Sequence, residues 1–120
     1  MSVVVQHARA HIVTDDDLRD DHASVPVVLR YDSRDPRSVR IGLPDRHEWT
    51  FSRSLLEQGL RAPAGTGEVR VWPCGRVQAV VEFHSAQGVS VVQFETRTLD
   101  RFLRRTYSAA EANTPAVVHR

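Results

Sequence analysis

The sequence predicts an α+β fold: a largely antiparallel sheet of about seven strands, with one helix after the fourth strand and another at the C-terminal end. Most of the chain alternates apolar and polar residues, which is the period of a half-buried strand. The period becomes helical only twice, near residues 52–60 and 99–106. The connections between successive strands are too short to hold crossover helices, which favours antiparallel pairing. A chain of 120 residues has the size of a single domain.

Seven segments carry the strand pattern, four before the first helix and three after it. The second contains Pro26, which is tolerated at the start of a strand or at a sheet edge. In the sixth, we expect every second residue to face inward, namely Val77, Ala79, Val81 and Phe83. The predicted strands cover residues 3–13, 25–31, 39–43, 49–51, 69–72, 77–83 and 89–95.

The connections between these strands are polar or rich in turn-forming residues. Residues 14–22 hold five aspartates against one arginine, so this run cannot bury itself and is predicted to be a solvated loop. Aspartates and a proline at 32–36 predict a turn. Residues 62–67, with two glycines and a proline, are predicted to be a loop.

The first predicted helix covers residues 52–60. Ser52 or Ser54 is the expected N-cap, because a serine side chain accepts a hydrogen bond from a free backbone N–H of the first turn. Ser54 followed by Glu57 also has the spacing of a capping box. Gly59 is expected to end the helix in the left-handed conformation.

The second predicted helix begins at Thr96 or Thr98, either of which is a suitable cap. We expect it to end near residue 107, with one domain over 1–107 and a flexible tail over the alanine-rich residues 108–120. Its apolar stripe follows the spacing i, i+3, i+4, i+7. The stripe residues are Leu99, Phe102, Leu103 and Thr106.

Composition excludes several classes of chemistry. All 16 basic residues are arginines, so the chain can supply neither a phosphate-loop lysine nor a Schiff-base lysine. The single Cys74 excludes intrachain disulfides and cysteine-based zinc sites, and it favours a reducing cytosolic setting. Neither a secretory signal nor a run long enough to cross a bilayer is visible.

Candidate catalytic and metal sites are weak. His7 and His11 would be about 13 Å apart on a strand, too far to share a metal without other ligands. The run at 14–22 lacks the glycine and glutamate of a calcium loop. No catalytic-cysteine motif surrounds Cys74, although His84 is near in sequence. We therefore predict no catalytic, cofactor or metal site and no enzyme activity.

Positive charge is concentrated on the last helix. The second half of the chain has 8 arginines and 5 acidic residues, and Arg97, Arg101, Arg104 and Arg105 less Asp100 account for its whole excess. These four arginines are the candidate partner-binding residues, for an acidic or phosphate-bearing partner. The alternative is a solvated helix whose basic end complements the helix dipole.

Three sequence blocks identify a family. In this order and spacing they resemble the SsgA-like proteins, which regulate sporulation and cell division in filamentous actinobacteria. A weaker fourth block covers residues 99–106, so the resemblance spans roughly residues 3–107. The three blocks are LRYDSRDP at 29–36, FSRSLLEQGL at 51–60 and PAGTGEVRVWP at 63–73.

The resemblance implies a non-enzymatic regulator that acts by protein–protein interaction. Family members help to place the sporulation septum or control cell-wall synthesis there. The implied partners are the division GTPase FtsZ or other septal proteins, reached directly or through a paralogue. It also implies a fold similar to the "whirly" fold, a homotrimer or other homo-oligomer, and a cytoplasmic protein recruited to the septum.

Whirly folds bind single-stranded DNA, so nucleic-acid binding is the alternative function. Such binding needs a basic groove interleaved with exposed aromatic residues on which bases stack. Here the aromatic residues fall mainly at core positions, and only Tyr107 adjoins the arginine cluster. Nucleic acid is therefore the less favoured partner.

Overall fold

The computed structural model describes residues 2–13, 24–44, 48–86 and 88–112. Over these residues, four strands, a helix, four strands and a second helix follow one another. The predicted order is confirmed, with eight strands in place of about seven. The elements are β1 (Val3–Val13), β2 (Ser24–Asp32), β3 (Ser38–Gly42), β4 (Glu48–Ser52), α1 (Arg53–Gly59), β5 (Ala64–Thr66), β6 (Val69–Cys74), β7 (Gln78–Ser85), β8 (Gly88–Glu95) and α2 (Thr96–Ala112).

The extra strand is β5, at a place where the sequence predicts a loop. Ala64 lies opposite Val71 and Thr66 opposite Val69 in antiparallel register with β6. Three residues with a glycine among them are too few to show a strand period. Pairing with the neighbouring strand, rather than local sequence, makes this segment extended.

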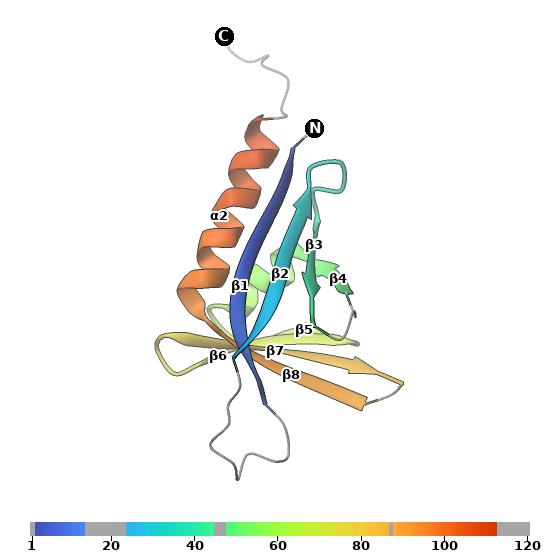
Figure 1. Ribbon diagram of the computed structural model, residues 1–120, viewed down its shortest axis with the longest axis vertical. Coiled ribbons are helices and arrows are strands. Elements are labelled where there is room, and N and C mark those ends of the chain that lie inside the picture. The colour runs from blue at the N-terminus through green and yellow to red at the C-terminus, as the bar shows by residue number, and fades with distance from the viewer. Residues whose placement is uncertain (1, 14–23, 45–47, 87, 113–120) are drawn as a thin grey trace.

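All eight strands form one antiparallel sheet in the order β4-β3-β2-β1-β8-β7-β6-β5. In Figure 1, β1–β4 run along the long axis of the molecule and β5–β8 run across it. The end of β1 joins the two halves, because His11–Val13 pair with Val91–Gln93 of β8. The sheet therefore turns sharply between its halves and encloses a core on one face.

Aromatic contacts close the interior between the two halves of the sheet. The rings of Trp49 on β4 and Phe83 on β7 stack with their centroids 4.8 Å apart. Phe51 meets the same Phe83 edge-on at 6.1 Å. Residues from the two halves of the sheet thus share one core, which is typical of a single cooperative domain.

The helix α2 lies alongside β1 (Figure 1) and contacts β1, β7 and β8. Its predicted stripe is confirmed. Each side chain of the stripe is at most 4% exposed, which holds for Leu99, Phe102, Leu103 and Thr106. Inward alternation is also confirmed for Ala79, Val81 and Phe83. It is wrong for Val77, which lies in the turn before β7 and is 69% exposed.

The helix α1 differs from the prediction at both ends. Its N-cap is Ser52, whose hydroxyl accepts a hydrogen bond from the backbone N–H of Leu55 at 3.2 Å. The capping box at Ser54 is therefore wrong. Gly59 is not among the glycines with positive φ, and the C-cap Leu60 is right-handed. Gly59 is needed for space instead, since a Cβ there would lie 2.3 Å from Cβ of Val71.

The helix α2 continues to Ala112, beyond the predicted end of the domain at residue 107. Ala109 and Ala110 are partly buried against the core, which explains why the alanine-rich segment is helical. Its last turn contains no basic residue. The prediction that Arg101, Arg104 and Arg105 complement the helix dipole at the C-terminal end is therefore wrong. Residues 113–120 and the acidic run at 14–22 lie outside the described residues.

Candidate partner-binding surface

The four candidate arginines are all exposed on α2, but they differ in their contacts. Arg104 forms an ion pair with Asp100 one turn earlier, at 3.0 Å. Arg105 extends over β1, where its Nη1 donates to the side-chain oxygen of Gln6 at 3.2 Å and lies 3.5 Å from a backbone oxygen. Among the described residues, Arg97 and Arg101 have no ion pair. Within the described residues, the structure thus separates Arg104 and Arg105, which have a polar partner, from Arg97 and Arg101, which have no ion pair.

The position of Arg97 is unfavourable for the helix itself. It is the second residue of α2, and the first turn contains no acidic residue. The N-terminal end of a helix carries partial positive charge, so a cation there is mildly destabilising. Neither helix stability nor an internal contact among the described residues explains an arginine at this position.

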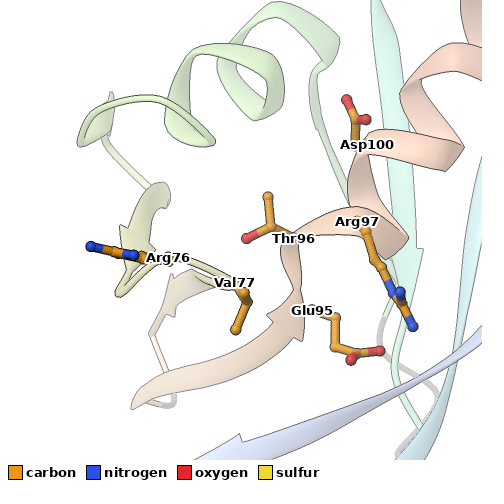
Figure 2. Close-up of a pocket in the computed structure, with 6 residues that line it drawn as sticks. All are labelled: Arg76, Val77, Glu95, Thr96, Arg97 and Asp100. Carbon is orange, nitrogen blue, oxygen red and sulfur yellow. The ribbon is translucent and has the colours of Figure 1, made fainter.

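A cleft lies between the β6–β7 turn and the start of α2, which we call the turn cleft (Figure 2). Its volume is about 530 Å³. The backbone N–H of Thr96 donates to the carbonyl of Val77 at 2.8 Å, which fixes the turn against the helix. The lining residues are Arg76, Val77, Glu95, Thr96, Arg97 and Asp100.

Sequence reasoning found Arg97 but missed Arg76 and Val77. Val77 follows a turn and begins an apolar alternation, so its sequence pattern is that of a buried strand residue. The structure starts β7 one residue later and leaves Val77 in the turn. The available signal was that Arg76 and Val77 directly follow Gly75, a turn-forming residue.

A second cleft, which we call the interhelix cleft, separates α1 from α2 and has a volume of about 290 Å³. It adjoins the turn cleft, and Thr96 and Asp100 line both clefts. Arg61, just after α1, is exposed at its rim. The lining residues are Glu57, Leu60, Arg61, Thr96, Asp100, Leu103, Arg104 and Tyr107.

An arginine staple, which sequence reasoning also missed, holds the two helices together. The guanidinium carbon of Arg53 lies 4.0 Å from the ring centroid of Tyr107 and 5.4 Å from that of Tyr31. Its Nη1 also lies 3.4 Å from the hydroxyl of Thr106. The hydroxyl of Tyr107 donates to the carboxylate of Glu57, and this hydrogen bond raises the pKa of Tyr107.

The described residues contain no group of three or more His, Cys, Asp or Glu side chains placed to hold a metal ion. His7 and His11 lie on β1, four residues apart on an extended strand as predicted. Cys74 is exposed at the end of β6. Neither described helix combines the length and apolar character needed to cross a membrane.

Residues 25–114 match the model of a protein family described as Streptomyces sporulation and cell division protein, SsgA. The chain belongs to the SsgA family. It is 39% identical over 97 residues to the sporulation-specific cell division protein SsgB of Streptomyces coelicolor, covering 75% of this chain and 71% of that protein. It is 40% identical to SsgB of Frankia casuarinae, covering 72% and 67%.

Solved structures of SsgA-like proteins have the same fold. One, from work on SsgB mutations that correlate with longitudinal cell division during sporulation of Streptomyces coelicolor, superposes with a TM-score of 0.77 at 32% identity. The match covers 90% of this chain and 88% of that one. A crystal structure of an SsgA-like sporulation-specific cell division protein from Thermobifida fusca gives 0.74 at 29% identity, covering 93% and 85%.

The SsgA-like sequence blocks correspond to the supports of α1. The block at 29–36 supplies Tyr31, against which Arg53 packs. The block at 51–60 supplies the cap, Arg53 and Gly59, and the block at 63–73 supplies β5 and the Val71 that Gly59 contacts. The residues that identify the SsgA family are thus largely those that position its short helix, rather than the exposed arginines of α2.

Proposed function

We propose that this SsgA-family protein is a non-enzymatic adaptor in sporulation-specific cell division, acting in septum placement or septal cell-wall synthesis by binding other proteins. Its relatives are named sporulation-specific cell division proteins. The observation that carries the proposal is the exposed arginine row on α2. Arg97 and Arg101 form no ion pair among the described residues, and the positive charge of Arg97 lies at the end of the helix where the dipole is also positive.

The binding surface in this proposal consists of Arg97, Arg101 and Arg104, with Arg105 at its margin over β1. Arginine suits such a surface because its planar fork binds carboxylates in pairs of hydrogen bonds. We propose FtsZ or another septal protein as the partner, directly or through a paralogue. The protein would be cytoplasmic, recruited to the septum, whirly-like in fold and a homotrimer or other homo-oligomer.

Single-stranded nucleic acid has less support as a partner. Tyr107 is the exposed large aromatic residue of the described chain, and it is 38% exposed. One of its ring faces is covered by Arg53, and its hydroxyl is bonded to Glu57. Bases stack on free aromatic faces, so this side chain is poorly placed for them.

Replacing the three surface arginines in the sporulating host tests the proposal. We expect the variant Arg97→Gln/Arg101→Gln/Arg104→Gln to fold normally, since glutamine is a good helix former and all three side chains are exposed. A fluorescent fusion of this variant should lose its position at sporulation septa, and septa should be misplaced or fewer.

The matched control removes the same charge elsewhere. Arg37, Arg40 and Arg70 are exposed and lie away from α2, in the β2–β3 turn, on β3 and on β6. Their triple replacement by glutamine should leave septa and localisation unchanged. Normal septation with the α2 variant, at normal protein level, would contradict the proposed surface.

A further inference from the structure

We propose that the two clefts form one groove, the α2 groove, which binds an acidic segment of a partner protein in extended conformation, with an apolar side chain seated on Val77. The inference rests on the proposed function in taking the partner to be a protein. It adds a binding site and the chemistry of its occupant. It also moves the main contact from the outer face of α2 to the side of the helix that faces α1 and the β6–β7 turn.

The groove is continuous along one stripe of α2. The stripe runs through Thr96, Asp100, Leu103 and Tyr107, at the spacing of a helix side, and Thr96 and Asp100 line both clefts. The eleven helical steps from Thr96 to Tyr107 rise about 16 Å. An extended peptide of about five residues spans that length. The groove is therefore the size of a short linear segment rather than of a small-molecule pocket.

Its positive charges are less neutralised than its negative ones. Asp100 is paired with Arg104, and the carboxylate of Glu57 accepts the hydrogen bond of Tyr107. Among the described residues, Glu95 remains as the acidic lining side chain without such a partner.

Three arginines oppose that single carboxylate. Arg61, Arg76 and Arg97 are exposed and line the groove, and none has an ion pair within the described part of the chain. They come from the segment after α1, the β6–β7 turn and α2, so they are distributed along the groove. Positive charge at several points favours a segment that carries several carboxylates.

An apolar contact distinguishes this groove from a general anion site. Val77 is 69% exposed although it lines the turn cleft. Figure 2 shows Arg76 extending away from α2, with Val77 between the turn and the helix start. Covering Val77 would remove apolar surface from water, which a phosphate backbone cannot do. We therefore infer a peptide that combines acidic and apolar residues.

The groove is fixed before any partner binds. The Thr96–Val77 backbone hydrogen bond holds the turn against α2. The Arg53 staple holds α1 against the same helix through Tyr107 and Thr106. A preformed groove spares the ordering cost that weakens most peptide complexes.

The test selects a phage-displayed library of random dodecapeptides on the full-length protein. We expect enriched peptides that combine Asp or Glu with an apolar residue. Fluorescein-labelled copies should bind in anisotropy titrations, more weakly as salt rises. Affinity should fall about tenfold or more in Arg61→Gln/Arg76→Gln, because this variant removes two positive charges that line the groove. A similar fall is expected in Val77→Asp, because the apolar contact is replaced by a negative charge that repels the acidic peptide.

The control variant Arg37→Gln/Arg40→Gln removes the same charge outside the groove and should change affinity less than about twofold. All substituted side chains are exposed, so folding is preserved, and circular dichroism checks it. Equal affinity for native protein and both groove variants would overturn the groove. So would competition by single-stranded oligonucleotides, or preferential binding of a peptide with the sequence of residues 14–22, which would indicate a second copy of the chain as occupant.

Septation in the host separates this inference from the proposed function. If no acidic peptide binds in the groove and Arg61→Gln/Arg76→Gln cells divide normally while Arg97→Gln/Arg101→Gln/Arg104→Gln cells do not, the groove is overturned and the adaptor function stands. If acidic peptides bind in the groove as expected but both strains divide normally, the adaptor function fails and the binding site stands.

Discussion

The two helices of this protein are held in place by different means. The helix α1 has seven residues and depends on particular contacts: one serine cap, one glycine pressed against Val71 and one arginine between two tyrosines. The helix α2 has seventeen residues and is held by a regular apolar stripe. When a helix packs through one apolar stripe, the residues on its other side do not contribute to the core, which is why the proposed binding residues lie mainly on α2.

The largest expected effect is at the centre of the α2 stripe. Phe102 is fully buried, so Phe102→Ala should lower the free energy of unfolding by about 3–5 kcal/mol through lost burial and the cavity left behind. Urea denaturation measures it. On the exposed side of the same helix, Arg101→Ala should change stability by less than about 0.5 kcal/mol. Comparable losses at both positions would contradict the division of α2 into two sides.

The next effect concerns the closest contact of α1. A Cβ on Gly59 would lie 2.3 Å from the Val71 Cβ and 2.9 Å from its carbonyl oxygen, so Gly59→Ala should cost about 1–3 kcal/mol. The added change Val71→Ala should cost less in the Gly59→Ala background than in the native protein. Gly42→Ala is the control, because its new Cβ would meet only ordinary contacts at 3.8 Å or more. If Gly59→Ala does not lower the free energy of unfolding, α1 can shift away from Val71 without loss of stability.

These two sites show what local sequence can and cannot predict. The stripe that contains Phe102 was predictable because helix periodicity is visible over eight consecutive residues. The role of Gly59 was not, because its neighbour Val71 is twelve positions away and belongs to another element. The Arg53 staple joins residues 53 positions apart, which no local pattern reveals. The prediction for Val77 was wrong because its apolar alternation fits the strand, but the turn includes Val77 and β7 begins only at Gln78.

The candidate site was predictable only in part, for the same reason. Charge counting located the arginines of α2, since four of them fall within nine consecutive residues. It could not separate Arg105, which reaches Gln6 on β1, from Arg101. Nor could it bring Arg61 and Arg76 beside α2, because their proximity depends on how the β6–β7 turn and the end of α1 pack against that helix.

A smaller effect is expected at the cap of α1. Ser52→Ala removes the acceptor for the N–H of Leu55 and should cost about 1 kcal/mol. Ser54→Ala should cost less, because in the described part of the chain the Ser54 hydroxyl contacts that of Ser52, at 2.9 Å, and caps no backbone group. Thermal unfolding of the two variants compares them. The reverse order would restore Ser54 as the cap and contradict the structure.

At the start of α2 the expected change has the opposite sign. Arg97→Gln removes a positive charge from the first turn and should raise the free energy of unfolding by about 0.3 kcal/mol at low salt, with the gain fading as salt rises. Arg101→Gln, in the middle of the helix, is the matched control and should show no such gain. A stability loss in Arg97→Gln would mean that this arginine serves the fold and not a partner.

The last effect tests the contact between the two helices and appears only in alkali. The Glu57 carboxylate accepts the hydrogen bond of Tyr107, which favours the protonated phenol and raises its pKa above the ordinary value of 10.0. The stability that this hydrogen bond adds to the folded protein is therefore complete below about pH 10, and it is lost as pH rises through the raised pKa of Tyr107. Tyr107→Phe has no phenol to ionise, so its unfolding free energy should fall less steeply in that range than that of the native protein.

Because Tyr107 is 38% exposed, solvent screens this interaction and the difference should be the smallest of the series. Parallel alkaline profiles for the two proteins would show that the Tyr107–Glu57 bond adds nothing to the joining of α1 and α2, and would leave Arg53 as the element that holds them together.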